Sequence, residues 1–343
     1  MAGPGNQSTL LSTITEPEFT DLVRRNWVAT QEFIPRNAKQ MFVMDPIGYN
    51  QGKSKLYNEY DTETYADDKP EGGPAQKAKI GVGYNMTMIA KTIAKQIDVT
   101  FEDRVQNRYP EVQAKLTSLM SFCENRTDLD LTHRFTFATS TSYVDLNGNT
   151  VSTVVGDGYQ LVYNAHTLAF SSITYSNRIS GDPSFSQTSL QAGLLLAASQ
   201  IYNNFGQRRT MNFNAIFCWQ DPATEQAIDQ LIRSTADVDA VQAGIINVYR
   251  DKFVRVTLPN LATTAAGAYD STKRQWWGIG AIGQGLNGWQ GIYGQWVAPF
   301  LKTPAPGNNG ENIDTWNWTY STGSMYGIVT VSPRGIIMGV PTS

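Results

Sequence analysis

The chain has 343 residues, of which 41% are hydrophobic and 17% charged, and its formal net charge at pH 7 is −3. This length supports one large domain or two ordinary ones with a buried core, and the composition excludes a disordered or fibrous chain. The slight negative charge argues against a surface built to grip nucleic acid, because such domains are usually clearly basic.

The N-terminal segment has no targeting signal. Residues 1–14 are small and polar, so we expect a flexible arm, and they lack the basic start and apolar stretch of a signal peptide. Thr15–Glu18 has the T-x-x-E pattern of a capping box, which predicts the start of a short amphipathic helix. Its apolar residues at helical spacing are Phe19, Leu22, Val23 and Trp27. The longest apolar run of the chain, around Leu194–Ala198, is far too short to cross a bilayer.

Residues 45–88 predict a long β-hairpin. Lys55–Tyr65 is rich in Tyr and Thr, and Ala66–Lys77 is a charged Pro/Gly loop in which Asp67, Asp68 and Glu71 could collect a cation only weakly. The returning strand alternates apolar with small or polar residues, which predicts one apolar face made of Ile80, Val82, Tyr84, Met86 and Met88. Two strands of about ten residues would reach ~30 Å. An isolated ribbon is marginal in water, so the hairpin either folds back on its own domain or lies across another subunit.

The next elements are expected to be helical. Thr100 can cap a helix through Asp103, and an apolar stripe continues as far as Cys123. Pro110 predicts a kink or a fresh helix start. Leu131–Ser152 then indicates the end of the helix, a strand and a D-L-N-G-N turn.

The second half alternates helices and strands. Ser186 and the Asp221-Pro222 pair each predict a helix start, and Gly206 predicts the end of the first helix. Predicted strands cover Asn212–Trp219, Lys252–Leu258, Met325–Val331 and Gly335–Val340. In the first of these, Phe213, Ala215, Phe217 and Trp219 would share one face. The expected class is α+β, without an internal repeat.

Charge is uneven along the chain. Residues 1–110 hold 13 of the 27 Lys and Arg and 14 of the 30 Asp and Glu, which leaves a long charge-poor remainder. Such a remainder is compatible with one large core, and equally with wide contacts between subunits, whose centres are depleted in charge.

The chemistry-bearing residues are sparse. We find no phosphate loop, H-E-x-x-H, C-x-x-C or G-x-S-x-G motif, and the glycines at 278, 280, 283 and 285 are not followed by a helix pattern. His166 could act as a base beside Tyr163 or Tyr175, with His133 as a distant companion, but a histidine held by local hydrogen bonds is the stronger interpretation. Cys123 and Cys218 are expected to be buried free thiols. No catalytic, cofactor or metal site is predicted.

Tryptophans cluster near the C-terminus. Six of the eight lie at positions 276, 277, 289, 296, 316 and 318. They could form a sugar-stacking platform, although such clusters are more often anchors of a core or an interface.

The order of four segments resembles the major capsid proteins of tailed bacteriophages, whose fold is named after phage HK97, and within them the Mu-like major head subunits. The first segment is Asp157–Leu168 with Thr174–Gly193, an apolar strand with a histidine, a polar loop and a serine-capped helix. The others are the strand–proline–helix unit Phe213–Ser234, the strand Gly291–Leu301, and the strand–Arg-Gly–strand end Tyr326–Val340. Together they cover about the last two thirds of the chain.

The resemblance implies a division of the chain. Residues 1–30 would form an N-terminal arm and residues 45–88 an extended loop over a neighbouring subunit. Residues 31–44, 89–155 and 319–343 would form a peripheral domain with a long spine helix. Residues 156–318 would form an axial domain.

The resemblance also implies a function, that of a non-enzymatic capsid subunit. It would assemble through pentamers and hexamers into an icosahedral shell around double-stranded DNA, in the virion, after assembly in the host cytoplasm. Portal, scaffolding or decoration proteins would be its partners, with no membrane. Expected contacts between subunits are Tyr57, Tyr60, Tyr65, Ile80, Val82, Tyr84, Trp276, Trp277, Trp289 and Trp296. The alternatives are an encapsulin-type compartment and a carbohydrate-binding module that uses the tryptophans.

Overall fold

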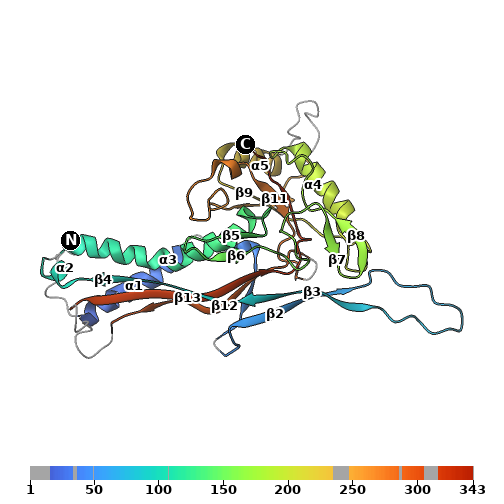
Figure 1. The fold of residues 1–343 in the computed structure, drawn as a ribbon. Coiled ribbons are helices and arrows are strands. Elements are labelled where there is room, and N and C mark those ends of the chain that lie inside the picture. Colours follow the sequence, from blue (N-terminus) through green and yellow to red (C-terminus); the bar gives the residue numbers. More distant parts are fainter. Residues whose placement is uncertain are drawn as a thin grey trace, which may run out of the picture.

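A computed structural model describes residues 16–33, 37–48, 50–106, 108–234, 247–285, 288–304 and 316–342. Residues 1–14 and the Thr15 cap therefore lie outside the described residues. Figure 1 shows three parts, an elongated layer with the longest helix and strands, a rounder body above it, and a hairpin that projects past both. None of the described helices is long and apolar enough to cross a bilayer.

The elongated layer is a sheet covered by helices. The sheet has the order β1 (Val43–Pro46), β12 (Gly291–Lys302), β13 (Trp318–Thr330), β4 (Lys91–Val99), and all neighbours are antiparallel except β1 and β12. Helices α1 (Glu16–Phe33) and α3 (Tyr109–Thr136) lie on it, and a 3₁₀ turn, η1 (Ala38–Met41), precedes β1. The apolar cluster between helices and sheet contains Phe19, Val23, Val99, Val112, Leu116, Leu119, Trp318 and Tyr320.

The helix starts follow local signals. Thr100 caps α2 (Phe101–Val105), and its side chain accepts a hydrogen bond from the Asp103 amide, as expected. Pro110 stands in the first turn of α3, which confirms a fresh start rather than a kink. Helix α3 then runs for 28 residues, well past Cys123. It continues because Leu131 and Phe135 are fully buried, while the Thr127 and Thr132 hydroxyls donate to carbonyls four residues earlier.

The rounder body contains a second sheet, with the order β10 (Val254–Thr257), β9 (Ala215–Cys218), β11 (Trp277–Gly280), β14 (Ile336–Gly339). Every residue of β9, β11 and β14 is buried, because both faces of these strands are covered. Ala215, Phe217 and Trp219 pack in one apolar cluster, whereas Phe213, which was expected on the same face, precedes β9 and packs in the other cluster with Ile216 and Cys218. Helix α4 (Gln187–Gln200) begins at a Ser186–Ser189 capping box and ends before Gly206, and α5 (Pro222–Arg233) is capped by Asp221. A 3₁₀ turn, η3 (Ser271–Lys273), precedes β11.

Two short hairpins remain, the first beside α3 and the second in the rounder body (Figure 1). β5 (Ser142–Val144) pairs with β6 (Thr150–Ser152), and the Asp145 carboxylate accepts from the amides of Asn147 and Asn149, which confirms the predicted turn. β7 (His166–Leu168) pairs with β8 (Ser171–Tyr175), so only the end of the 157–168 stretch is a strand.

The strand pairing differs from the expected division in two places. β12 was expected in the axial part, 156–318, but it pairs with β13 and β1 in the elongated layer. β14 was expected in the peripheral part, 319–343, but it pairs with β11 in the body. The chain crosses between the two parts at Gly335, which packs closely on the backbone of Trp289. A glycine is needed there, because an added Cβ would lie 2.3 Å from the Trp289 backbone nitrogen.

Candidate interaction surfaces

A β-bulge sets the two faces of the projecting hairpin. β2 (Ser54–Thr62) pairs antiparallel with β3 (Ile80–Ile89), as the sequence predicted. The register slips between the pairs Asn58–Asn85 and Tyr60–Val82, so that β3 contains one residue more than β2 between these two pairs. The expected apolar face of β3 is therefore split, with Ile80 and Val82 outward and the later members turned toward the chain itself.

The outward face is apolar and open. It carries five large side chains that are 49–74% exposed, which we call the arm stripe: Leu56, Tyr60, Ile80, Val82 and Ile89. Cross-strand partners share a face, so Tyr60 and Val82 lie side by side on it. Its two ends are apolar, with Tyr60, Ile80 and Val82 at one end and Leu56 and Ile89 at the other, and the Asn58–Asn85 pair lies between them. Large exposed apolar side chains gathered in this way indicate a contact site for another molecule.

The inward face of the hairpin is ionic and buried. Glu59 and Asp61 alternate with outward residues along β2 and meet Arg334, whose guanidinium nitrogens lie 3.1 Å from Glu59 Oε1 and 3.0 Å from Asp61 Oδ2. Arg334 also donates to Asn204 Oδ1 at 2.7 Å, and the Asn204 amide donates to Asp61 at 2.8 Å. Burial alone would lower the pKa of Arg334, but Glu59, Tyr175 and Asp61 raise it. The arm base is thus clamped to the body by a paired buried charge cluster.

Gly83 makes this clamp possible. A Cβ at this position would lie 2.4 Å from Asn204 Nδ2 and 2.9 Å from Glu59 Oε2. The bulge therefore coincides with the point where the ribbon approaches the body most closely. Sequence reasoning missed the clamp, although Glu59 and Asp61 at i, i+2 share one face of a strand, which is a detectable signal.

Beyond Thr64, the tip of the hairpin forms no hydrogen bond or ion pair with the described residues of the body. The last contacts are from the Thr64 amide to Gln207 Oε1, at 2.6 Å, and from Asn203 Nδ2 to Thr64 Oγ1, at 3.1 Å. The acidic residues Asp67, Asp68 and Glu71 are all exposed. Within the described residues no group of three or more His, Cys, Asp and Glu could hold a metal ion.

The six arm residues predicted to contact a neighbour fall into two groups. Tyr60, Tyr65, Ile80 and Val82 are exposed. Tyr57 and Tyr84 instead bind their own chain, because the Tyr57 hydroxyl donates to Asp45 and the Tyr84 hydroxyl lies 2.9 Å from Thr167 Oγ1. Partial burial and the Asp45 carboxylate raise the pKa of Tyr57.

The tryptophans predicted as subunit contacts belong to the interior. Trp276, Trp277, Trp289 and Trp296 are at most 8% exposed, so their side chains are closed to a neighbouring subunit and that prediction is wrong. Two of them donate to backbone carbonyls, Trp277 to Pro183 at 2.9 Å and Trp296 to Gly52 at 2.7 Å. Apolar burial and the Gly-rich surroundings account for the cluster.

A sugar platform does not form from these residues. Trp318 is also buried, so of the six clustered tryptophans Trp316 alone is exposed, and it packs edge-on against Phe101 at 5.6 Å. Stacking on a sugar ring needs an accessible indole face, and five of the six lack one.

Both histidines have structural partners. His166 is fully buried, with Nδ1 2.7 Å from Asp157 Oδ2 and its ring stacked on Tyr175. His133 is buried on α3, and this burial lowers its pKa to about 4, although the nearby Asp130 carboxylate acts in the opposite direction. Cys123 and Cys218 are buried free thiols, as predicted.

Solved structures with a similar backbone are shells. The capsid protein of Ralstonia phage GP4 has a TM-score of 0.50 and 10% identity, over 90% of this chain and 89% of that chain. The capsid protein of cyanophage P-SCSP1u has a TM-score of 0.48 and 12% identity, over 88% and 86%. A virus-like particle from Pyrococcus furiosus has a TM-score of 0.48 and 9% identity, over 93% and 97%. No protein-family model and no curated protein sequence matches the chain.

The Ralstonia phage match covers both chains almost completely and shows a shared fold. The chain therefore has the α+β, HK97-type capsid fold that the resemblance implied.

Proposed function

We propose that this chain is the major capsid protein of a tailed bacteriophage, which assembles into an icosahedral shell around packaged double-stranded DNA. The observation that carries the proposal is the two-sided arm. Its inner face is clamped to the body by Arg334, Glu59 and Asp61, and its outer face presents the arm stripe. A shell subunit needs this combination of a rigid base and an apolar surface directed at a neighbour.

The shared fold supports the proposal, since the similar structures are themselves capsids and a virus-like particle. In such a shell the subunits would gather as pentamers and hexamers, with the body as axial domain and the elongated layer as peripheral domain. The near-neutral charge fits contact with packaged DNA without sequence readout.

Location and partners follow from the same role. The protein would reside in the virion after assembly in the host cytoplasm. A portal protein would be needed for DNA entry, and scaffolding or decoration proteins would be further partners. The protein would act by assembly and not by catalysis.

The test is the size of what the purified chain forms. Light scattering and negative-stain electron microscopy should show capsomers, closed shells or tubes that appear above a threshold concentration, because many weak contacts make closure cooperative. A monomer that persists at high concentration, at low and at high salt, would overturn the proposal.

Nucleic acid separates the phage capsid from an encapsulin-type compartment. Particles isolated from the native source should contain double-stranded DNA that survives nuclease treatment of the outside. Protein cargo with no DNA would favour the compartment.

A further inference from the structure

The elongated layer has an unpaired edge that a groove accompanies. β4 lies at the end of the sheet, and β13 is its one strand neighbour within the described residues. It has nine residues, Lys91–Val99, with no proline, no glycine and no register slip against β13. Proteins usually blunt such an edge with proline, bulges or short length, because its free amide and carbonyl groups recruit further strands.

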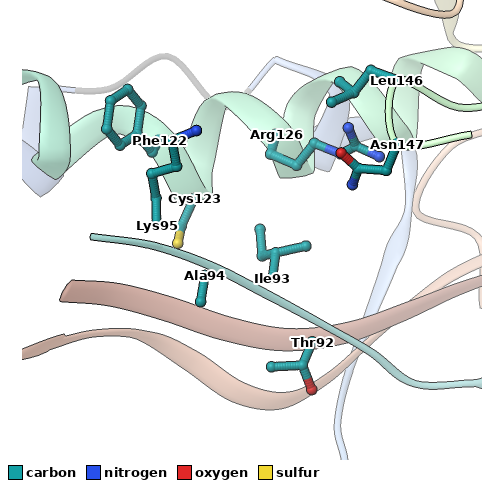
Figure 2. A pocket seen from close by; sticks show the side chains of 9 residues that line it. All are labelled: Thr92, Ile93, Ala94, Lys95, Phe122, Cys123, Arg126, Leu146 and Asn147. Carbon is teal, nitrogen blue, oxygen red and sulfur yellow. The ribbon is translucent and has the colours of Figure 1, made fainter. Parts of the chain in front are cut away.

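A cavity of about 400 Å³ runs along this edge beneath α3 (Figure 2). Four consecutive residues of β4, Thr92–Lys95, border it, so the backbone of the strand lines the cavity and not only one row of side chains. The rest of the lining is Phe122, Cys123, Arg126, Leu146 and Asn147. The site is therefore a strand-shaped groove with an apolar floor.

One positively charged side chain of the groove, that of Lys95, has no carboxylate beside it in the described part of the chain, as comparison with its neighbours shows. Arg126 is held by Asp130 and Asp145, at 3.2 Å and 2.9 Å. Lys91 is paired with the same Asp130. Lys95 is exposed and forms no ion pair among the residues that the structure describes. An incoming strand with a carboxylate opposite Lys95 would complete the site.

The arm offers a segment of that chemistry. Tyr65–Lys69, sequence YADDK, is exposed, belongs to no helix or strand and lies outside the β2–β3 ladder, whose last backbone bond joins the Glu63 amide to the Lys79 carbonyl. It carries Asp67 and Asp68 and has an aromatic residue at its start. The other limb of the tip, Pro74–Lys79, carries two lysines and begins with proline, so it suits the groove poorly.

One chain cannot make this contact by itself. The tip of the arm and the β4–α3 groove lie in opposite parts of the elongated molecule (Figure 1). The five residues of the segment span ~16 Å when extended, which matches the four-residue border of the groove at ~13 Å.

We propose that Tyr65–Lys69 of one copy adds as a fifth strand to the β4 edge of a second copy, with Asp67, which shares a strand face with Tyr65, paired with Lys95. Tyr65 then lies over the apolar floor near Phe122. This inference rests on the proposed shell function and names the surface that receives the arm. It also explains why the β4 edge is long and unprotected.

The test is a disulfide between copies. In assembled particles of the double variant Asp67→Cys/Lys95→Cys, mild oxidation should produce a ladder of dimers, trimers and larger species on a non-reducing gel. All variants also carry Cys123→Ser, because Cys123 lines the same groove as Lys95, whereas Cys218 is buried elsewhere. Matched controls are each single variant and the pair Asp67→Cys/Gln191→Cys, whose second cysteine stands on the exposed side of α4. Particles that form normally without a ladder above these controls would overturn the inference and leave the shell function intact.

Charge exchange provides an independent test. Lys95→Asp should slow assembly about tenfold or more, and Asp67→Lys added to it should restore most of the rate. A double variant as slow as Lys95→Asp alone counts against the pairing. A wild-type chain that never assembles would remove the proposed function and this inference together.

Discussion

The body and the arm use similar residues in opposite ways. In the body, Trp277 and Trp289 are almost completely buried, each in an apolar core that combines residues of several helices and strands. In the arm, Ile80 and Tyr60 are more than half exposed, although they are equally apolar. The body has enough layers to cover its apolar residues, whereas a two-stranded ribbon has only one face that its own chain can cover.

This difference teaches where to look for assembly contacts. The clustering of aromatic residues in the sequence led us to predict subunit contacts at the tryptophans, yet their side chains are buried in the interior of the chain. The contact surface that we propose is the part of the arm that no helix or second sheet of the chain covers. Changes in the body should therefore reduce the stability of the single chain, and changes on the arm should reduce association.

The largest effect should come from the body core. Trp277→Ala removes a fully buried indole between Phe185 and the central strands, so we expect a loss of about 4–5 kcal/mol in the free energy of unfolding. Urea unfolding of the unassembled chain, followed by circular dichroism, measures it. A loss under about 1 kcal/mol would break the contrast with the arm.

The clamp between arm and body should come next. Arg334→Met leaves Glu59 buried without its cation and leaves Asp61 with Arg209 alone, at 3.5 Å, so we expect a loss of about 3–4 kcal/mol in the free energy of unfolding. The triple variant Arg334→Met/Glu59→Gln/Asp61→Asn should recover part of this loss, since it removes the unpaired charges. If the single and triple variants were equally stable in urea unfolding, the unpaired charges would not be the cause of the lost stability.

Acid should weaken the body through His133. Its folded pKa is about 4, below the ordinary value of 6.5, because burial disfavours the charged form. Above pH 6.5 the ring is neutral in both states, so its stability contribution is complete there. As the pH falls from 6.5 toward 4, the unfolded state takes up the proton first, and the loss grows to about 3 kcal/mol.

Comparison with His133→Gln isolates this contribution, since carboxylates titrate alike in both chains. The difference in unfolding free energy between the two chains should shrink as the pH falls from 7 to 4. A constant difference across that range would contradict the prediction.

The smallest effect on stability should come from the arm stripe. Ile80→Ser/Val82→Ser alters side chains that are 74% and 49% exposed, so the free energy of unfolding should change by about 0.5 kcal/mol or less. Particle yield by light scattering should nevertheless fall strongly. Val248→Ser, at an equally exposed position of the body, is the matched control and should assemble normally if the stripe is the contact.

Local chemistry determined much of the secondary structure. The caps at Thr100, Ser186 and Asp221 and the turn after Asp145 depend on hydrogen bonds within a few residues, and each is where the sequence predicted it. Pro110 likewise marks a helix start by its own geometry. The hairpin could be predicted because alternating apolar and polar residues directly adjoin a Pro/Gly-rich loop in the sequence.

The tertiary structure decided what these elements face. The bulge that divides the apolar residues of β3, the exchange of β12 and β14 between the two sheets, and the burial of the tryptophans all depend on distant partners. Arg334 meets Asp61 across 273 positions of sequence. A pattern within ten residues reports the period of a strand, but which of its faces is covered is set by the free energy of packing against segments that the pattern does not contain.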